Sequence, residues 1–250
     1  MCFSEADMLF GLFFGDWTIL ILIPAMIFTV IAQIKVRSVF ERYQKLTCAK
    51  GITGAEAARR ILDSNGLYHV SIERVRGHLS DHYDPRTNVI RLSESTYDSA
   101  GIAAVGVAAH EAGHAIQYAK GYLPIKIRGA IIPITSFGSR LAIPLFLIGL
   151  LLTSFSLVNG AVGEYMMLAG IVLFSLTTLF QLVTLPTEFN ASRRAMRALA
   201  DTGVLYEEEL GGARQVLTAA AMTYVAALAT SLAYLLRFIL IASSASRRRR

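Results

Sequence analysis

Near the middle of the chain, an apolar run carries three ionisable side chains and reads Val107-Ala108-Ala109-His110-Glu111-Ala112-Gly113-His114-Ala115-Ile116-Gln117. On an α-helix, residues four apart lie on one face, so the imidazoles of His110 and His114 can bind one metal ion together. Glu111 stands where a carboxylate can take a proton from a metal-bound water. The alternative is a pair of core histidines with an incidental glutamate, but three ionisable groups on an apolar helix need a reason. The run therefore predicts a catalytic zinc site with Glu111 as the general base.

The residues around this run predict a buried helix. Ser99 can cap its start, and Gly121 is placed to end it. Between residues 100 and 116 the chain is almost entirely Ala, Val, Ile and Gly apart from the motif. The polar face of the helix is then the motif itself, so we expect this helix to carry the site.

The composition indicates a membrane protein, since 54% of the residues are hydrophobic and only 17% are charged. Four apolar runs are long enough to cross a bilayer, namely 17–34, 142–158, 166–185 and 219–241. We interpret the first as a signal anchor, and the second and third as a hairpin joined by a short loop at 159–165. The fourth is rich in Ala and Thr and contains Arg237, so a buried amphipathic helix is its alternative.

The distribution of charge predicts the orientation in the membrane. Glu5, Asp7 and Asp16 precede the first run without any Lys or Arg, whereas basic residues follow it, namely Lys35, Arg37, Arg42, Lys45, Lys50, Arg59 and Arg60. The positive-inside rule places the N-terminus outside and segment 35–140 in the cytosol. If the fourth run crosses fully, the arginine tail 247–250 ends outside, against the rule; either that run lies in the interface or the first spans outweigh the tail.

The net charge of +6 is explained by contact with anionic lipid headgroups, and four terminal arginines are too few to indicate a nucleic-acid partner. Membrane lipids are therefore the expected partners of the basic residues.

The segment after the first span has the element order of a zincin peptidase. Thr53-Gly54-Ala55-Glu56 has capping-box spacing and opens a helix that ends near residue 65. Short β-like pieces follow at 69–75, 77–83 and 89–92, with a turn at 84–88. A helix, a small sheet and then a His-Glu helix is the order of zincins, in which an edge strand binds an extended substrate. A peptide or protein, including a membrane protein, is the expected substrate.

A third ligand must come from elsewhere, because a catalytic zinc takes three protein ligands. The metzincin pattern is excluded, since Gln117 and Lys120 stand where it needs Gly and His. Glu188 is the best downstream carboxylate, and the two spans before it return it to the same side of the membrane as the histidines. Glu188 could instead be a helix-start carboxylate. His78 and His82 could supply an all-imidazole site.

Three runs resemble the YugP-like bacterial membrane zinc metallopeptidases: 77–85 (GHLSDHYDP), 107–117 (VAAHEAGHAIQ) and 188–194 (EFNASRR). The likeness extends in order over nearly the whole chain, and the chain is more distantly similar to the HtpX heat-shock proteases and the CAAX prenyl proteases. The resemblance implies a gluzincin-type site in which one Zn2+ per chain is bound by His110, His114 and Glu188, with Glu111 as base. It also implies the bacterial cell membrane as location.

The surroundings of the implied site differ from those of the distant relatives. There an Asp four residues after the ligand Glu orients a histidine, whereas this chain has Ser192. Asp81 or Asp84 could take this role through space. The candidate donors for the developing oxyanion are His82, Tyr83 and Arg193.

We therefore expect a mainly α membrane protein, with about four transmembrane helices and a gluzincin-like α+β zinc-peptidase core on the cytosolic side. The expected segments are a first region with the first span (1–34), a zincin-like domain (35–140), a transmembrane hairpin (141–185), a third-ligand helix and following helix (186–217), and a fourth transmembrane or interfacial helix with the tail (218–250).

The predicted function is that of a membrane-embedded zinc-dependent endopeptidase, in membrane quality control or processing. A non-catalytic zinc-binding scaffold or assembly factor is the alternative, although it has no use for Glu111. A site-2-type intramembrane protease is disfavoured because the run around the motif is short for a span, and a transporter because the four spans lack paired repeats. The sequence leaves the oligomeric state open.

Overall fold

The computed structural model describes residues 17–78, 80–155 and 160–247. The acidic residues before position 17, part of the predicted hairpin loop and the last three arginines lie outside them. The chain folds into two compact units. We call Met1–Val30, Ala130–Leu182 and Ala226–Arg250 the helical unit, and Ile31–Gly129 and Val183–Val225 the site unit.

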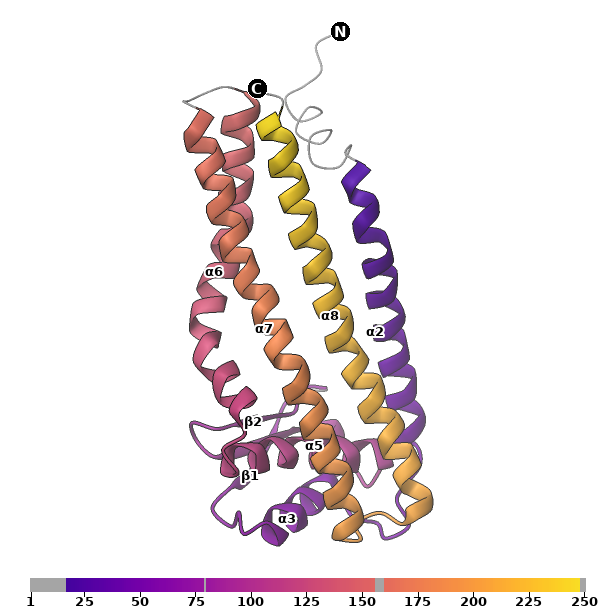
Figure 1. Ribbon diagram of the computed structural model, residues 1–250. Helices are drawn as coiled ribbons and strands as arrows, with labels where there is room; N and C mark the ends of the chain where they lie inside the picture. The colour runs from indigo at the N-terminus through magenta and orange to yellow at the C-terminus, as the bar shows by residue number, and fades with distance from the viewer. Residues whose placement is uncertain (1–16, 79, 156–159, 248–250) are drawn as a thin grey trace. The chain divides into compact units, whose positions relative to one another are not determined.

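The described elements are mainly helices, with one small sheet (Figure 1). In chain order they are η1 (Trp17–Ile21), α2 (Leu22–Gln44), α3 (Gly54–Ser64), β1 (Ser71–Val75), β2 (His82–Asp84), β3 (Val89–Ser93), α4 (Glu94–Tyr97), α5 (Ile102–Ala119), α6 (Leu123–Ser154), α7 (Gly160–Asp201) and α8 (Glu207–Arg247).

Four helical segments are long and apolar enough to cross a membrane: Trp17–Gln44, Leu123–Ser154, Ala161–Asp201 and Glu207–Ser246. They contain the first, third and fourth predicted runs and residues 142–154 of the second, whose last residues lie outside the described helix. Only 17% to 28% of the residues in their most apolar windows are buried, as expected where lipid is the solvent. The outward apolar surface of α8 agrees with a span rather than with a buried amphipathic helix.

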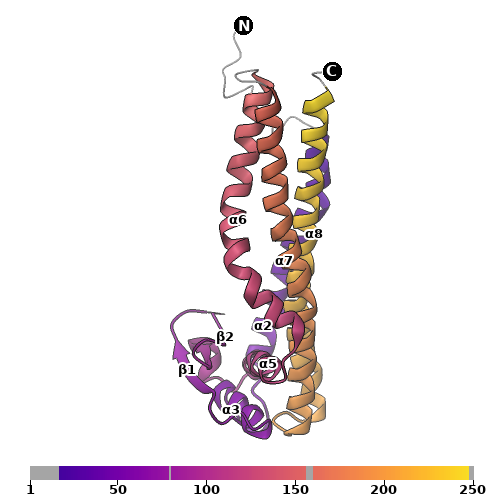
Figure 2. The same ribbon diagram turned by 60° about the vertical axis from the view of Figure 1, so that its left-hand side comes forward.

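Within the helical unit, α6, α7 and α8 run side by side (Figures 1 and 2). Small residues allow this packing: a Cβ on Gly170 of α7 would lie 2.8 Å from the carbonyl oxygen of Ala142 on α6. Phe146 and Phe238 stack at 4.4 Å between ring centroids and join α6 to α8.

Helix α7 continues further than the sequence indicated. It begins at Gly160, which shortens the predicted loop, and it runs unbroken through Pro186 to Asp201. Glu188 therefore lies inside a long helix, and its interpretation as a helix-start carboxylate is wrong. A proline removes one backbone hydrogen bond, and the remaining bonds of this 42-residue helix hold it together across that position.

The sheet of the site unit has the strand order β1-β3-β2, so β3 is central. Strand β1 is parallel to β3, with Ile72 opposite Ile90, and β2 is antiparallel to β3, with Tyr83 opposite Ile90. Strand β2 is shorter than predicted and begins five residues after Gly77, whose φ of 115° departs from a strand conformation. Because β3 is paired on both sides, β2 forms one edge of the sheet.

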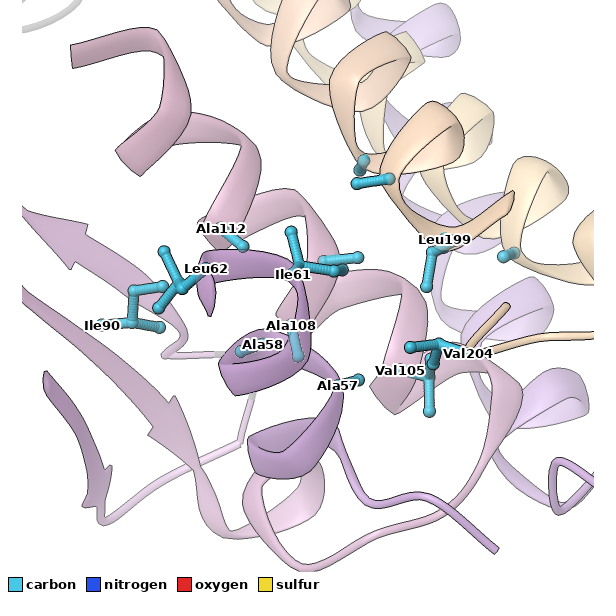
Figure 3. Close-up of a cluster of buried hydrophobic side chains, with 14 of the residues drawn as sticks. Ala57, Ala58, Ile61, Leu62, Ile90, Val105, Ala108, Ala112, Leu199 and Val204 are labelled. Carbon is cyan, nitrogen blue, oxygen red and sulfur yellow. The ribbon is translucent and has the colours of Figure 1, made fainter. Parts of the chain in front are cut away.

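The core of the site unit lies between α3, α5 and β3 (Figure 3). Ile61 and Leu62 of α3 pack with Ala108 of α5 and Ile90 of β3, and all four are fully buried. The predicted capping box of α3 is confirmed, since Thr53 accepts from the Glu56 amide and the Glu56 carboxylate accepts from the Thr53 amide. One face of α5 is thus fixed in the core, and another is left for the site.

Candidate metal centre

Helix α5 presents its polar residues on one face. His110, His114 and Gln117 are spaced four and three residues apart, so they follow one another along the helix. The helix begins after Gly101 rather than Ser99, and it ends before Gly121, whose φ of 65° suits a helix terminus. The predicted helix is confirmed, with its start shifted by two residues.

Helix α7 brings Glu188 against both histidines. Glu188 Oε2 lies 3.1 Å from His110 Nε2 and 3.6 Å from His114 Nε2. One potential ligand atom from each of the three residues lies within 4.8 Å of the others. The side chain of Glu188 is only 2% exposed, so its charge needs these partners.

Gly113 lets α5 and α7 approach each other at this point. A Cβ on Gly113 would lie 2.6 Å from the backbone oxygen of Ala191, which is too close for any larger residue. The glycine inside the motif therefore has a packing role: it brings the helix with the histidines against the helix with Glu188.

A hydrogen-bond network fixes the ring of His114. Its Nδ1 lies 3.0 Å from Gln117 Oε1, while Gln117 Nε2 donates to the backbone oxygen of Thr187 and to Asn190 Oδ1, at 2.8 and 3.0 Å. Because the amide nitrogen is used in these two bonds, the amide oxygen must accept from His114. The proton of His114 is then on Nδ1, and the lone pair of Nε2 faces Glu188.

The ring of His110 is oriented by Ser192, whose Oγ lies 3.2 Å from His110 Nδ1. Ser192 occupies the position at which an Asp is common in the distant relatives. Asp81 and Asp84 are used elsewhere, because their carboxylates accept from the backbone amides of Ser93 and Arg86. The interpretation that one of these aspartates orients a ligand histidine is therefore wrong; Ser192 and Gln117 contact the histidines.

Two contacts of Glu188 were not found from the sequence. Arg128 on α6 lies with Nη1 3.1 Å from Glu188 Oε1, which leaves Oε2 facing the histidines. The side chain of Tyr224 on α8 lies close enough to Glu188 and Glu111 to interact with both electrostatically. For Arg128 the available signal was an arginine at the start of an apolar helix. Tyr224 lies in an apolar run, and nothing in the sequence around it pointed to the site.

Glu111 is 8% exposed, and removal from water raises the pKa of its carboxyl to about 7. This net shift includes smaller effects of nearby charges: His110 and His82 act to lower the pKa, and Glu188 and Asp81 act to raise it. A carboxyl group with a pKa near neutrality can both accept and release a proton at physiological pH. The burial of Glu111 therefore suits an acid–base role.

The other predicted residues lie at different distances from this centre. His82 is exposed on β2, with Nδ1 2.9 Å from the backbone oxygen of Ser80, and it is close enough to influence Glu111. The hydroxyl of Tyr83 donates to Asn88 Oδ1 in the turn, 3.0 Å away. Arg193 is exposed and lines a groove between α7 and α8. His78 packs edge-on against Phe40, away from the converging ligands.

These residues fit a zinc ion. Two imidazoles and one carboxylate form the donor set of several three-ligand catalytic zinc sites. The partners of His110 and His114 leave both Nε2 atoms directed at Glu188 Oε2, and Arg128 engages the other carboxylate oxygen. His110, His114 and Glu188 could thus form the metal site.

Comparison with known proteins agrees with this site. Residues 18–243 match the family described as "Putative neutral zinc metallopeptidase". The chain is 50% identical over 210 residues to the "Putative membrane protease YugP" of Bacillus subtilis (strain 168), an alignment that covers 84% of this chain and 89% of that protein. No solved structure matches the chain. Since the family match includes all three converging residues and nearly all of the four apolar helices, the chain belongs to the neutral zinc metallopeptidases and is related to a bacterial membrane protease.

Proposed function

We propose that the protein is a membrane-embedded endopeptidase of the gluzincin type that hydrolyses peptide bonds with a zinc-activated water. The observation that carries the proposal is the convergence of His110, His114 and Glu188 beside the buried carboxyl of Glu111. A structural metal site has no need of an acid–base group at this position, so Glu111 favours an enzyme over a scaffold.

In the proposed reaction, bound zinc supplies the positive charge that acidifies water and polarises the scissile carbonyl. Glu111 accepts a proton from the attacking water and later passes it to the nitrogen of the leaving amine. Gln117 and Ser192 keep the histidine rings in place through the hydrogen bonds at Nδ1. Arg128 holds Glu188 as a carboxylate turned toward the histidines.

The negative charge that develops on the carbonyl oxygen requires a donor, and such a donor contributes about 2.7–4 kcal/mol. Tyr224 is the favoured candidate, because it is close enough to interact electrostatically with both Glu188 and Glu111. His82 is the second candidate, since it lies near Glu111. We retain Tyr83 and Arg193 only as weaker candidates, because Tyr83 donates to Asn88 and Arg193 lines a separate groove.

Strand β2 is the proposed binding site for the substrate backbone. It lies at the edge of the sheet, and Asp81 and His82 are close enough to influence Glu111. An extended peptide can add to such an edge through main-chain hydrogen bonds, which select for conformation more than for side chains. Unfolded or locally extended segments of proteins, including membrane proteins, are therefore the proposed substrates.

We propose that this site faces the cytosol, because basic residues follow the first span and the positive-inside rule favours that side for them. Extended segments of damaged or unprocessed membrane proteins are accessible there. We accordingly assign the enzyme to membrane quality control or processing.

The deciding experiment compares purified full-length wild type with Glu111→Gln, both loaded with zinc, in cleavage of an unfolded protein. The isosteric amide keeps the size of the side chain and removes its basicity. We expect both proteins to contain zinc and only the wild type to cleave, with cleavage abolished by a chelator. Equal cleavage by both would overturn the role of Glu111. No cleavage by either protein, with full zinc in both, would favour the scaffold function.

A further inference from the structure

A concave site lies between α7 and α8 in the site unit, and it contains neither Glu111 nor the three converging residues His110, His114 and Glu188. It is a groove of about 340 Å³ whose lining is both apolar and cationic. Phe189, Met196 and Leu217 supply apolar surface, and Arg193, Arg197 and Arg214 supply guanidinium groups. No step of the proposed reaction uses these six side chains together.

The two ends of the groove are lined by different kinds of residue. Helices α7 and α8 are joined by the short connection 202–206, so they run antiparallel, and Figures 1 and 2 show their site-unit ends side by side. In this arrangement Arg197 and Arg214 are the lining residues of α7 and α8 nearest to the connection, and Phe189 and Ala221 are those farthest from it. The groove therefore has a cationic end and an apolar end.

The three arginines are available to a ligand. All three are exposed, and within the described residues none of them forms an ion pair with a carboxylate. Phe189 is 39% exposed even though it is an aromatic residue next to the buried Glu188. Unpaired guanidinium groups beside exposed apolar surface favour a ligand that has both an anionic and an apolar part.

We propose that this groove binds one anionic phospholipid. The headgroup phosphate is bound by Arg193, Arg197 and Arg214, whose planar guanidinium groups suit phosphate oxygens. The beginning of the acyl chain lies on Met196, Leu217 and Phe189. Along the chain, Arg193 follows the apolar run that ends at Leu185, and basic residues beyond the end of a span are attracted to anionic headgroups.

An occupied groove would lie directly behind one of the metal ligands. Ser192 lines the groove, and its hydroxyl contacts His110 Nδ1. The lipid-binding proposal itself does not depend on catalysis, so it can be tested by binding alone.

The test uses a reporter inside the groove of the full-length protein. The chain has one tryptophan, Trp17, so the double variant Trp17→Phe/Phe189→Trp places the only indole in the groove. The protein is reconstituted in bilayers in which brominated phosphatidylglycerol or brominated phosphatidylcholine replaces increasing fractions of the lipid. We expect the anionic lipid to quench the indole at a mole fraction about tenfold lower than the zwitterionic lipid.

Arg193→Gln/Arg197→Gln/Arg214→Gln in the reporter background should abolish this preference. The matched control, Arg60→Gln/Arg76→Gln/Arg86→Gln, removes the same charge from exposed positions elsewhere in the site unit and should keep it. Circular dichroism of each variant verifies the fold. Equal quenching by the two lipids in the reporter protein, or a preference that survives loss of the three groove arginines, would overturn the proposal. Displacement of the anionic lipid by inorganic phosphate, at an ionic strength where chloride has no effect, would mean that the groove binds phosphate alone. This result would also overturn the proposal.

Discussion

The helical unit and the site unit use the same aliphatic residues in opposite ways. Ile61 in the site unit is fully buried, whereas Ile134 in the helical unit is 61% exposed. In water, burial of aliphatic surface drives folding, but lipid is as apolar as the side chains and gives no such preference. Close backbone packing and a few hydrogen bonds therefore hold the helical unit together, and a hydrophobic core holds the site unit. A polar residue inside the core of the site unit lowers stability unless it is paired, so such residues are the ones that indicate function.

The largest expected effect is on the metal. Glu188→Ala removes the carboxylate that both histidines face, so we expect the zinc dissociation constant to rise more than about 100-fold. Zinc content after dialysis against a weak chelator measures this. Glu208→Ala, an exposed carboxylate of α8, should keep full zinc. A fully metallated Glu188→Ala protein would remove Glu188 from the ligand set.

Because water surrounds the site unit and lipid surrounds the helical unit, the same substitution should lower the free energy of unfolding by different amounts in the two units. Ile61→Ala leaves a cavity in the core of the site unit, so we expect the free energy of unfolding to fall by about 2–5 kcal/mol. Ile134→Ala should cost less than about 1 kcal/mol, since lipid fills the space. Denaturation of both variants in the same detergent measures the difference. Equal losses would show that Ile134 is packed against protein.

The contact between α5 and α7 can be tested with two glycines. Gly113→Ala places a Cβ 2.6 Å from the backbone oxygen of Ala191, so the helices must separate, at a cost of about 1–3 kcal/mol and with weaker zinc binding. Gly211→Ala has no atom within 4 Å and should stabilise α8 by about 0.5–1 kcal/mol. Thermal melting with and without zinc checks both. A neutral Gly113→Ala would contradict the close approach.

Loss of a residue that holds a metal ligand in place should weaken zinc binding less than loss of the ligand itself. Gln117→Leu removes the acceptor that holds His114 Nδ1, and we expect zinc affinity to fall by about 10–100-fold. Competition with a chromogenic chelator measures the affinity. Gln215→Leu, at an exposed position of α8, is the control. An unchanged affinity would mean that His114 keeps its orientation without Gln117.

The smallest effect is expected inside the helical unit. Thr178 Oγ1 and Ser231 Oγ are 2.7 Å apart between buried parts of α7 and α8. Hydrogen bonds between transmembrane helices contribute about 0.6 kcal/mol on average, so a double-mutant cycle with Thr178→Val and Ser231→Ala should give a coupling of this size. A coupling above about 2 kcal/mol would mean that polar contacts, rather than close packing, hold this unit together.

Local features of the fold were predictable because they depend on neighbours in sequence. The capping box at Thr53, the turn at 84–88 and the His-Glu helix follow from backbone propensities over a few residues. The apolar runs were found from composition over about twenty residues. The continuation of α7 through Pro186 was missed, because a proline is a strong local signal and the tertiary contacts of Glu188 with α5, α6 and α8 lie outside any local window.

The sequence by itself determined that two histidines share one face of a helix and that the chain has membrane-spanning composition. Spacing of four residues on a helix places His110 and His114 on one face whatever the rest of the chain does, and the pattern of apolar runs identifies a membrane protein. Glu188 could be proposed because two spans return the chain to the same side.

Only the tertiary structure decided which groups surround those ligands. Gln117 and Ser192 contact the histidines, Arg128 pairs with Glu188, Tyr224 lies near Glu188, and Arg193 lines a groove between α7 and α8. These arrangements depend on how α5, α6, α7 and α8 pack, and packing depends on contacts between residues far apart in sequence. Such contacts have no periodic pattern in the sequence, because glutamine, serine, arginine and tyrosine also occur on helix surfaces that have no functional role.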